Sequence, residues 1–399
     1  MAGEEARIPP ALAEQMLRLP GHSVVLRLPD QKRVSVKHQD ASTVDDSTIV
    51  IKMLAAGVCG TDLAILSGAR PGQAEILGHE GVGVVAYAPQ NCGLSKGTRL
   101  IINPVHQKDP HIVIGHSRDG IFREWFCLAA ADADEGGFLV SCPRDCLVGD
   151  LELALAEPVA SALYSLELIR EKRTAASLLI RGSGTMGILT AKLWSVLTGR
   201  DAILVSKSEA HARWLREHTH WPANVHICWT ATLPGLLGER VSSDLKAAIL
   251  CCSREDAPEG LGLLLDTVQD GATINLMAGF PADYRESRLG DVPLDGLRWN
   301  NIRGVNSAPP TAVVDRRGGK TVYLVGHRGT AEHHVLHAVD LLSRGVISLA
   351  DVPHRPLTLD ELPGAVAEML SSNAGRAVMW VKAMVAFSQR GWGEFFADC

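Results

Sequence analysis

The sequence lacks a surplus of positive charge, a long apolar run and a basic, apolar start. Its 39 Lys and Arg residues face 45 Asp and Glu, a net charge of -6, so no basic excess exists to neutralise nucleic-acid phosphates. No apolar run reaches the length of a membrane span. The first residues have neither the basic start nor the apolar stretch of a secretory signal. We therefore expect a cytoplasmic protein with no nucleic-acid partner and no membrane association.

Cysteine is present, but not in the pattern of a disulfide framework. The nine cysteines are an odd number, and Cys251 and Cys252 are adjacent, so free thiols in a reducing compartment are expected. Hydrophobic residues make up 46% of the 399 residues and charged residues 21%, which is typical of a folded protein. A chain of this length favours two domains.

A glycine-rich turn stands between two apolar segments near the middle of the chain. Gly182, Gly184 and Gly187 form the pattern G-x-G-x-x-G between the apolar run 177–181 and a segment with helical spacing. A second apolar run, 202–205, follows at the distance that a strand-helix-strand unit requires. This context predicts a dinucleotide site, with Thr185 and Met186 at the helix start beside the pyrophosphate.

The residues after the second apolar run favour NADP(H) over NAD(H). Ser206 stands where an NAD site usually has Asp or Glu to hold the ribose hydroxyls, and Lys207 follows it. This pair removes a repulsive carboxylate and supplies a cation for a 2′-phosphate. Arg213 either adds a second positive contact or lies on the solvated surface.

The hydrophobic pattern divides the chain into a β-rich part and an α/β part. We expect a discontinuous β-rich domain at 1–160 and 310–399 and a doubly wound parallel-sheet domain at 161–309, an α/β protein overall. Helical spacing over 152–169 predicts a connecting helix, and further helices are expected at 331–344 and 359–372. Strands are expected at 23–28, 33–37, 48–53, 83–87, 96–102, 177–181, 202–206, 247–251, 272–277, around 302 and at 377–381.

Metal-ligating residue types occur in three segments upstream of the glycine turn. Cys59, His79 and Glu80 supply a thiolate, an imidazole and a carboxylate, which suit three ligands of a tetrahedral Zn²⁺ site with one open position. Glu157, next to a proline, is a fourth ligand or one that exchanges with water. Taken singly, each residue also has an ordinary structural explanation.

Together these segments resemble the medium-chain dehydrogenase/reductase family, specifically its zinc-dependent alcohol and polyol dehydrogenases. The resemblance rests on the motifs at 57–62, 78–83, 157–158 and 182–187, which occur in family order. It implies a GroES-like catalytic domain interrupted by a Rossmann coenzyme domain, with the active site in the cleft between them. It also implies zinc ligation by Cys59, His79 and Glu157, with Glu80 as a ligand or an immediate neighbour.

The resemblance assigns chemistry to further residues and implies a reaction. Thr61 would hydrogen-bond the substrate oxygen and pass on its proton, and Asp62 would orient a metal ligand. Glutamate at position 157 resembles the sorbitol and sugar dehydrogenases. We therefore expect NADP(H)-linked interconversion of a secondary alcohol and a ketone on a sugar, polyol or cyclitol, phosphorylated or not, by a homodimer or homotetramer.

The sequence departs from the family pattern at several points. Ala64 stands where many members have a proton-relaying histidine, and His106 is one replacement that the sequence cannot rank. The region 105–126 has no cysteine, so we expect one catalytic zinc and no structural zinc. Arg328, in a glycine-rich stretch, either contacts a substrate anion or the coenzyme, or lies exposed in a helix-capping loop. Two alternatives stay open: a zinc-free NADPH-dependent quinone or enone reductase of the same superfamily, and a non-catalytic NADPH-binding protein.

Overall fold

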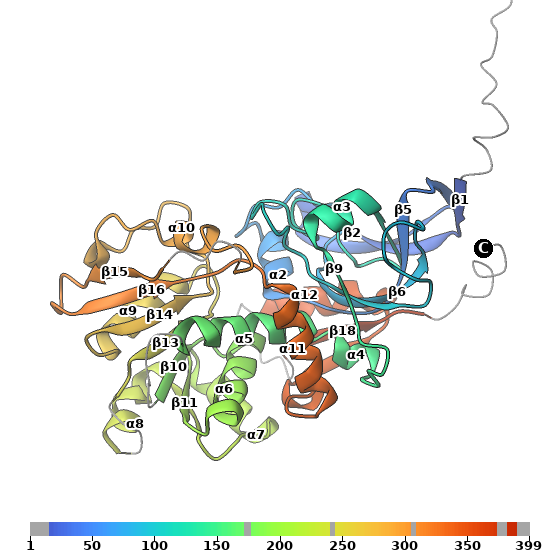
Figure 1. Ribbon diagram of the computed structural model, residues 1–399. Helices are drawn as coiled ribbons and strands as arrows, with labels where there is room; N and C mark the ends of the chain where they lie inside the picture. Colours follow the sequence, from blue (N-terminus) through green and yellow to red (C-terminus); the bar gives the residue numbers. More distant parts are fainter. Residues whose placement is uncertain (1–15, 171–176, 240–243, 305–308, 373–380, 389–399) are drawn as a thin grey trace, which may run out of the picture.

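Two seven-stranded sheets dominate the computed structural model (Figure 1). The structure describes residues 16–170, 177–239, 244–304, 309–372 and 381–388. One sheet belongs to a β-rich lobe, here called the catalytic lobe, and the other to an α/β lobe, here called the coenzyme lobe. The expected α/β fold class, a GroES-like β-rich domain joined to a parallel-sheet Rossmann domain, is confirmed.

The catalytic lobe contains strands from both ends of the chain. Its sheet has the order β17-β18-β5-β6-β7-β9, and β8 pairs with β5 on the side. These strands are β5 (Thr48–Gly57), β6 (Glu80–Tyr87), β7 (Arg99–Ile102), β8 (Trp125–Ala129), β9 (Leu139–Ser141), β17 (His354–Leu357) and β18 (Lys382–Ala386). Two short antiparallel pairs flank them: β1 (Met16–Leu19) with β4 (Ser42–Asp45), and β2 (His22–Leu28) with β3 (Arg33–Gln39).

The coenzyme lobe is a doubly wound sheet with the order β12-β11-β10-β13-β14-β16-β15. Its strands are parallel except for the edge strand β15. They are β10 (Ser177–Arg181), β11 (Asp201–Ser206), β12 (Val225–Trp229), β13 (Ala247–Leu250), β14 (Ala272–Leu276), β15 (Thr311–Val314) and β16 (Thr321–Val325).

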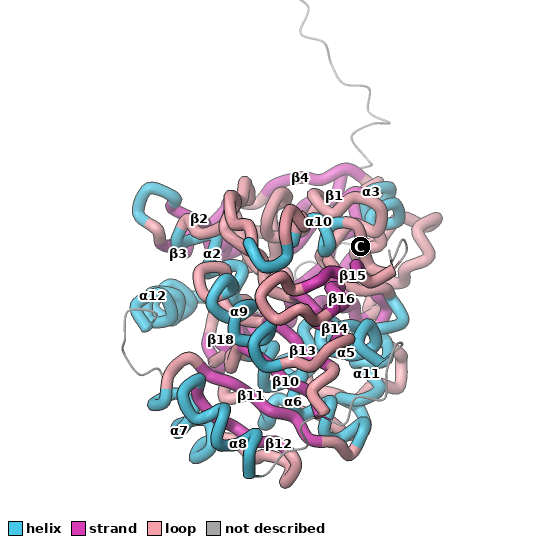
Figure 2. The backbone as a smooth tube through the Cα atoms, turned by 90° about the vertical axis from the view of Figure 1, so that its left-hand side faces the viewer, coloured by secondary structure: helices cyan, strands magenta, loops and turns pink. Residues whose placement is uncertain are grey.

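Helices cover both faces of this parallel sheet (Figure 2). Leu178 and Ile180 of β10 face one apolar cluster while Leu179, between them, faces another, because successive strand residues point to opposite faces. The helices are α5 (Ala156–Arg170), α6 (Thr185–Thr198), α7 (Glu209–His218), α8 (Leu233–Glu239), α9 (Ala257–Thr267), α10 (Leu294–Trp299) and α11 (Glu332–Ser343). The catalytic lobe adds α2 (Gly60–Ser67), α3 (Ala130–Gly136), α4 (Asp150–Leu153) and α12 (Leu362–Ser372). Across the described ranges, no helix has the length and apolarity needed to span a membrane.

A single apolar cluster joins the two lobes around α5. It includes Val82 and Ile101 from the catalytic sheet, Leu163 of α5, and Leu189 and Val339 from helices of the coenzyme side. All of these side chains are almost completely buried. This cluster therefore crosses the junction, while each lobe also has an apolar cluster of its own.

The glycine turn after β10 needs glycine at two positions for different reasons. Gly182 has φ of 127°, a conformation that residues with a side chain rarely adopt. A Cβ atom on Gly187 would stand 1.9 Å from the carbonyl oxygen of Gly182, so only glycine allows α6 to approach the strand this closely. Gly184, in contrast, has open space around it.

The structure corrects several expectations about elements and boundaries. Strands β15 and β16, which follow residue 309, pair within the sheet of the coenzyme lobe and were not among the expected strands. Ile302 forms only an isolated bridge, with Arg328, and no strand. The expected helix at 152–169 is two helices, α4 and α5. Of the expected strand at 377–381, residues 377–380 lie outside the described residues.

Replacing Gly187 by alanine tests the close approach of α6 to β10. The added methyl group must displace the helix start, so we expect Gly187→Ala to lower the free energy of unfolding by about 1–3 kcal/mol. Urea unfolding measures this effect. Gly262→Ala, in open space within α9, is the matched control and should be neutral or stabilising by up to about 1 kcal/mol. Equal stability of the two variants would contradict the packing described here.

Candidate metal centre and coenzyme site

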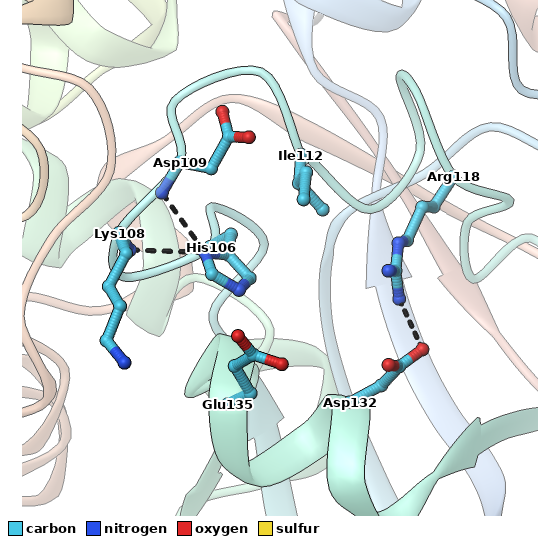
Figure 3. A pocket seen from close by; sticks show the side chains of 7 residues that line it. All are labelled: His106, Lys108, Asp109, Ile112, Arg118, Asp132 and Glu135. Carbon is cyan, nitrogen blue, oxygen red and sulfur yellow. Dashed lines mark hydrogen bonds and ion pairs between the residues drawn. The ribbon is translucent and has the colours of Figure 1, made fainter.

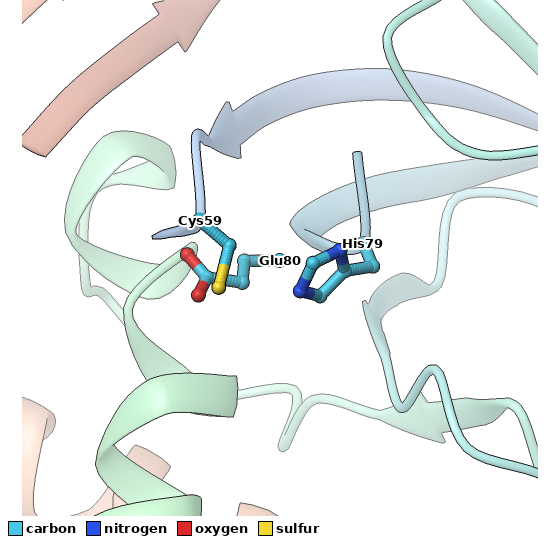
Figure 4. Close-up of side chains that lie close together, drawn as sticks. All are labelled: Cys59, His79 and Glu80. Atoms are coloured by element: carbon cyan, nitrogen blue, oxygen red, sulfur yellow. The ribbon is translucent and has the colours of Figure 1, made fainter. Parts of the chain in front are cut away.

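Strand pairing brings the cysteine and histidine motifs together. Cys59 follows the end of β5 and is the N-cap of α2, whereas His79 and Glu80 stand at the start of β6. Because β5 and β6 are antiparallel and Gly57 pairs with Glu80, the two motifs meet at the same end of the sheet. One ligand atom from each of Cys59, His79 and Glu80 lies within 4.8 Å of the others (Figure 4). We call these three residues the metal cluster.

Asp62 holds the two halves of the metal cluster in place. Its buried carboxylate accepts hydrogen bonds from the backbone N–H of Cys59, at 2.9 Å, and of Gly78, at 3.1 Å. The Oδ1 atom also lies 3.4 Å from Nδ1 of His79. This contact orients the imidazole and leaves its Nε2 atom for a metal ion.

The charges around His79 favour its protonated form when no metal is bound. Burial by itself lowers the pKa of His79, but the negative charges of Asp62 and Cys59 outweigh this effect and raise that pKa well above its usual value. The site therefore attracts positive charge at this position, as a cation-binding site should.

Lys382, on β18, is an important neighbour that the sequence did not reveal. Its ammonium group forms an ion pair with Glu80 and donates a hydrogen bond to the carbonyl of Val58 at 3.2 Å. Both partners are buried, with side chains 1% and 3% exposed. Although burial lowers the pKa of Lys382, the charges of Glu80 and Cys59 raise it above its usual value. In this structure the Glu80 carboxylate thus faces a cation of the protein itself.

Glu157 lies in the first turn of α5, close to the metal cluster but outside its 4.8 Å grouping. Its carboxylate accepts a hydrogen bond from Ser161 at 3.3 Å. Burial and the negative charge of Glu80 raise the pKa of Glu157 to about 7. The structure therefore brings both candidate carboxylates to the site, and the ion pair with Lys382 distinguishes Glu80 from Glu157.

Ala64 stands where a relay histidine was expected, so the positions of two other histidines, His106 and His116, matter for proton transfer. His106 lines a pocket with Lys108, Asp109 and Glu135 (Figure 3), and its Nδ1 accepts the N–H groups of Lys108 and Asp109 at 3.1 Å. In the described parts of the chain, its polar contacts stay within this loop.

His116, which the sequence analysis did not single out, lies beside the metal cluster. Its ring meets the ring of His79 edge-on at 4.8 Å between centroids. Both of its ring nitrogens are buried without a hydrogen-bond partner among the described residues. Burial and the charge of His79 lower the pKa of His116 well below its usual value.

Of the candidate relay residues, Thr61 stands in the first turn of α2, two positions after Cys59, and is partly exposed.

The start of α6 has the features of a phosphate site. Gly184 is its N-cap and supplies no side-chain cap, so the first N–H groups of the helix remain available to a ligand. Thr185 and Met186 are partly exposed there, and the Thr185 hydroxyl donates to the carbonyl of Val381 at 3.4 Å. This contact connects the glycine turn to the strand that carries Lys382.

The residues expected to choose the coenzyme lie at the end of β11. Ser206 is buried, and its hydroxyl oxygen accepts hydrogen bonds from the hydroxyl of Ser183 at 3.1 Å and from a backbone N–H at 3.3 Å. Lys207 is paired with Asp256, so a 2′-phosphate would have to compete with that carboxylate. Arg213 is exposed and paired with Glu209 at 3.1 Å, which agrees with the surface interpretation.

Comparisons with known proteins agree with the fold. Residues 45–133 match the family model of the alcohol dehydrogenase GroES-like domain. The chain is 26% identical over 226 residues to D-xylulose reductase of Saccharomyces cerevisiae, covering 51% of this chain and 59% of that protein. It is 23% identical over 365 residues to L-threonine 3-dehydrogenase of Streptomyces coelicolor, covering 84% and 93%.

Solved structures extend the likeness to nearly the whole fold. A protein from Sinorhizobium meliloti 1021, assigned as a zinc-binding dehydrogenase and bound to NADP, superposes with a TM-score of 0.67 and 20% identity over 92% of this chain and 100% of that one. L-idonate 5-dehydrogenase from Escherichia coli K-12 gives a TM-score of 0.66 and 17% identity over 94% and 100%.

These findings define the class of the protein. The chain has the two-lobed fold of the medium-chain dehydrogenases/reductases and contains their GroES-like domain, so the family resemblance is confirmed. Within that class it is similar to the zinc-binding alcohol and polyol dehydrogenases. The match spans 59% of the length of D-xylulose reductase.

Removing the cation from the buried pair tests the role assigned to Lys382. In metal-free protein, we expect Lys382→Met to lower the free energy of unfolding by about 3–5 kcal/mol, because it leaves the Glu80 carboxylate buried without a partner. The double variant with Glu80→Gln should recover most of this loss. Urea unfolding in the presence of chelator measures both, and a double variant no more stable than Lys382→Met would contradict the pairing.

Proposed function

We propose that the protein is a zinc-dependent, NADP(H)-linked oxidoreductase that interconverts a secondary alcohol and a ketone on a polyhydroxylated substrate. The observation that carries this proposal is the metal cluster of Cys59, His79 and Glu80, oriented by Asp62 and flanked by Glu157. A thiolate, an imidazole with a free Nε2 atom and carboxylates are the donor set that zinc prefers. The three donors fit one tetrahedral ion with room for a further ligand.

Zinc bound here would supply a Lewis acid for the oxygen of the alcohol or ketone, and NADP(H) would supply or accept the hydride. The residues of the chain hold these partners in position. Asp62 fixes the imidazole of His79, and Lys382 balances the charge of Glu80. The hydroxyl of Thr61, in the adjacent turn, would hydrogen-bond the substrate oxygen and pass its proton onward.

The preference for polyhydroxylated substrates and for NADP(H) rests on separate observations. Glu157 at the metal site and the relatives that act on polyols support a sugar, polyol or cyclitol substrate. Ser206 and Lys207 at the end of β11 support NADP(H), because neither would repel a 2′-phosphate. The proposed protein is cytoplasmic and forms a homodimer or homotetramer. The edge strand β15 would pair across a two-fold axis.

Metal analysis tests the zinc assignment before any substrate is known. We expect about one zinc per chain in protein purified without chelator, and a loss of most metal and turnover together in Cys59→Ser. Elemental analysis and an alcohol oxidation assay measure the two properties. Cys127→Ser, away from the metal cluster, is the matched control and should keep its zinc. Full turnover by metal-free protein would contradict the proposal and favour the zinc-free reductase.

Charge changes at the end of β11 test the choice of coenzyme. Ser206→Asp should lower kcat/KM for NADP at least about tenfold relative to NAD, because the new carboxylate repels the 2′-phosphate. Asp256→Asn should act in the opposite direction, since it releases Lys207 from its ion pair. Steady-state kinetics with both coenzymes gives these ratios. An unchanged ratio in both variants would exclude this segment as the selector.

A further inference from the structure

Four arginines from four separate segments lie within electrostatic reach of one another, and one of them also within reach of Cys59. Arg70 lies in the catalytic lobe just after α2. Arg254 follows β13, Arg298 is in α10 and Arg328 follows β16, all in the coenzyme lobe. We call them the arginine cluster. Figure 1 shows α2 and α10 on the facing sides of the two lobes.

Glycines allow two of these side chains to approach the ends of the parallel strands. A Cβ atom on Gly279, just after β14, would lie 2.7 Å from Arg254 and 3.1 Å from Arg298. A Cβ on Gly326, just after β16, would lie 2.7 Å from Arg298. The two guanidinium groups therefore stand at the carboxyl ends of the strands, the edge where doubly wound sheets bind ligands.

Arg328 and Arg70 extend the cluster toward the metal ligands. The backbone N–H of Arg328 donates to the carbonyl of Asn301 at 2.9 Å, which places it beside the segment that follows α10. Burial and the charge of Arg254 lower the pKa of Arg70, while the charge of Cys59 opposes the change. Arg70 thus lies within electrostatic reach of both the arginines and the metal cluster.

The positive charges in this cluster are poorly compensated. Asp295 lies 3.9 Å from both Arg254 and Arg298, longer than a good hydrogen bond. Nε of Arg298 is buried and has no hydrogen-bond partner in the described part of the chain. Burial and the charges of neighbouring arginines lower the pKa of Arg298 to about 9 and that of Arg328 to about 10.

Arg288 shows what a fully paired arginine looks like in the same lobe. It contacts Asp315 at 2.6 Å and Asp266 at 2.8 Å, and these carboxylates raise its pKa above the usual value. Gathering several guanidinium groups with few and distant carboxylate partners costs folding free energy, because like charges repel and partial burial removes some of their hydration. An anionic ligand that binds among them would offset this cost.

We propose that the arginine cluster binds the phosphate group of a phosphorylated sugar or polyol whose reacting carbon lies at the metal cluster. Guanidinium groups bind phosphate oxygens through paired, charge-assisted hydrogen bonds. The pyrophosphate of the coenzyme has its own expected place at the start of α6, whereas Arg70 lies on the catalytic lobe near Cys59. This inference rests on the proposed oxidoreductase function and specifies its substrate class.

Binding of inorganic phosphate tests the cluster without reference to activity. Wild-type protein saturated with NADPH should bind phosphate in a calorimetric titration, and phosphate should raise its melting temperature. Arg298→Met should abolish both effects. In phosphate-free buffer it should also melt higher than wild type, because it removes a partly buried positive charge that the neighbouring arginines repel. Arg344→Met, an exposed arginine paired with Asp340, is the matched control and should behave as wild type. Phosphate binding that persists in both Arg298→Met and Arg70→Met would overturn the proposal.

Kinetics with matched substrates tests the substrate class. Five- and six-carbon polyols should be compared with their terminal phosphate esters, and the ester should have the higher kcat/KM. Arg70→Met should lower the ester-to-polyol ratio of kcat/KM by about ten- to a hundredfold, and Arg70→Lys by less. If Arg298→Met folds poorly, Arg70→Met still decides the outcome, since it lies in the other lobe.

The outcomes separate this inference from the function on which it rests. Turnover of neutral polyols with no gain from the phosphate group would overturn the inference and leave the oxidoreductase proposal intact. Loss of NADPH affinity in Arg70→Met and Arg298→Met, with an unchanged ester-to-polyol ratio, would assign the cluster to the coenzyme and also overturn it. Phosphate binding at the cluster in a protein with no zinc and no turnover would instead contradict the proposed function.

Discussion

The carboxylate of Asp62 is the contact on which the candidate site depends. It accepts the N–H groups of Cys59 and Gly78 and faces Nδ1 of His79, so one buried side chain fixes the start of α2, the turn before β6 and the imidazole. Without it, the segments that carry the thiolate and the imidazole would be joined only by the pairing of β5 with β6. The geometry of a metal site requires that such ligands be held before the ion arrives, which is the role of second-layer hydrogen bonds.

Several charged groups near this contact are buried or partly buried. Lys382 balances Glu80, Glu157 is buried in the first turn of α5, and the arginines of the cluster are partly buried. Buried charges weaken a fold unless they are paired. Buried charges also occur elsewhere, as in the pairs Lys52–Glu124 and Lys192–Asp351, but here they lie beside residues that could ligate a metal.

Local patterns explain why part of the site could be predicted from the sequence. The glycine turn depends on residues within a short segment, and Gly182 and Gly187 each prove to be required by a conformation or a contact that only glycine allows. The cysteine and histidine motifs stand at the ends of strands, so their meeting follows from the pairing of β5 with β6. The roles proposed for these residues in metal and coenzyme binding stay predictions.

Other features depend on tertiary contacts that no local pattern encodes. Lys382 reaches Glu80 from more than 300 positions away, and Arg70, Arg254 and Arg298 come from three unrelated segments. Two coenzyme-sheet strands, β15 and β16, were missed because Pro309-Pro310 reads as a domain boundary, whereas it precedes the antiparallel edge strand. A strand was expected around Ile302, but this residue takes part only in a single bridge.

The apolar cluster around α5 joins two lobes that each also have a cluster of their own. Two lobes that share no such cluster can melt in two steps. Here the side chains of both lobes pack on the same helix, so neither lobe can unfold without exposing the apolar surface of the other. Heating should therefore produce a single cooperative calorimetric transition, because both lobes pack on α5. Because Glu157 stands in the first turn of this helix, the candidate metal site is anchored to the most cooperative part of the fold.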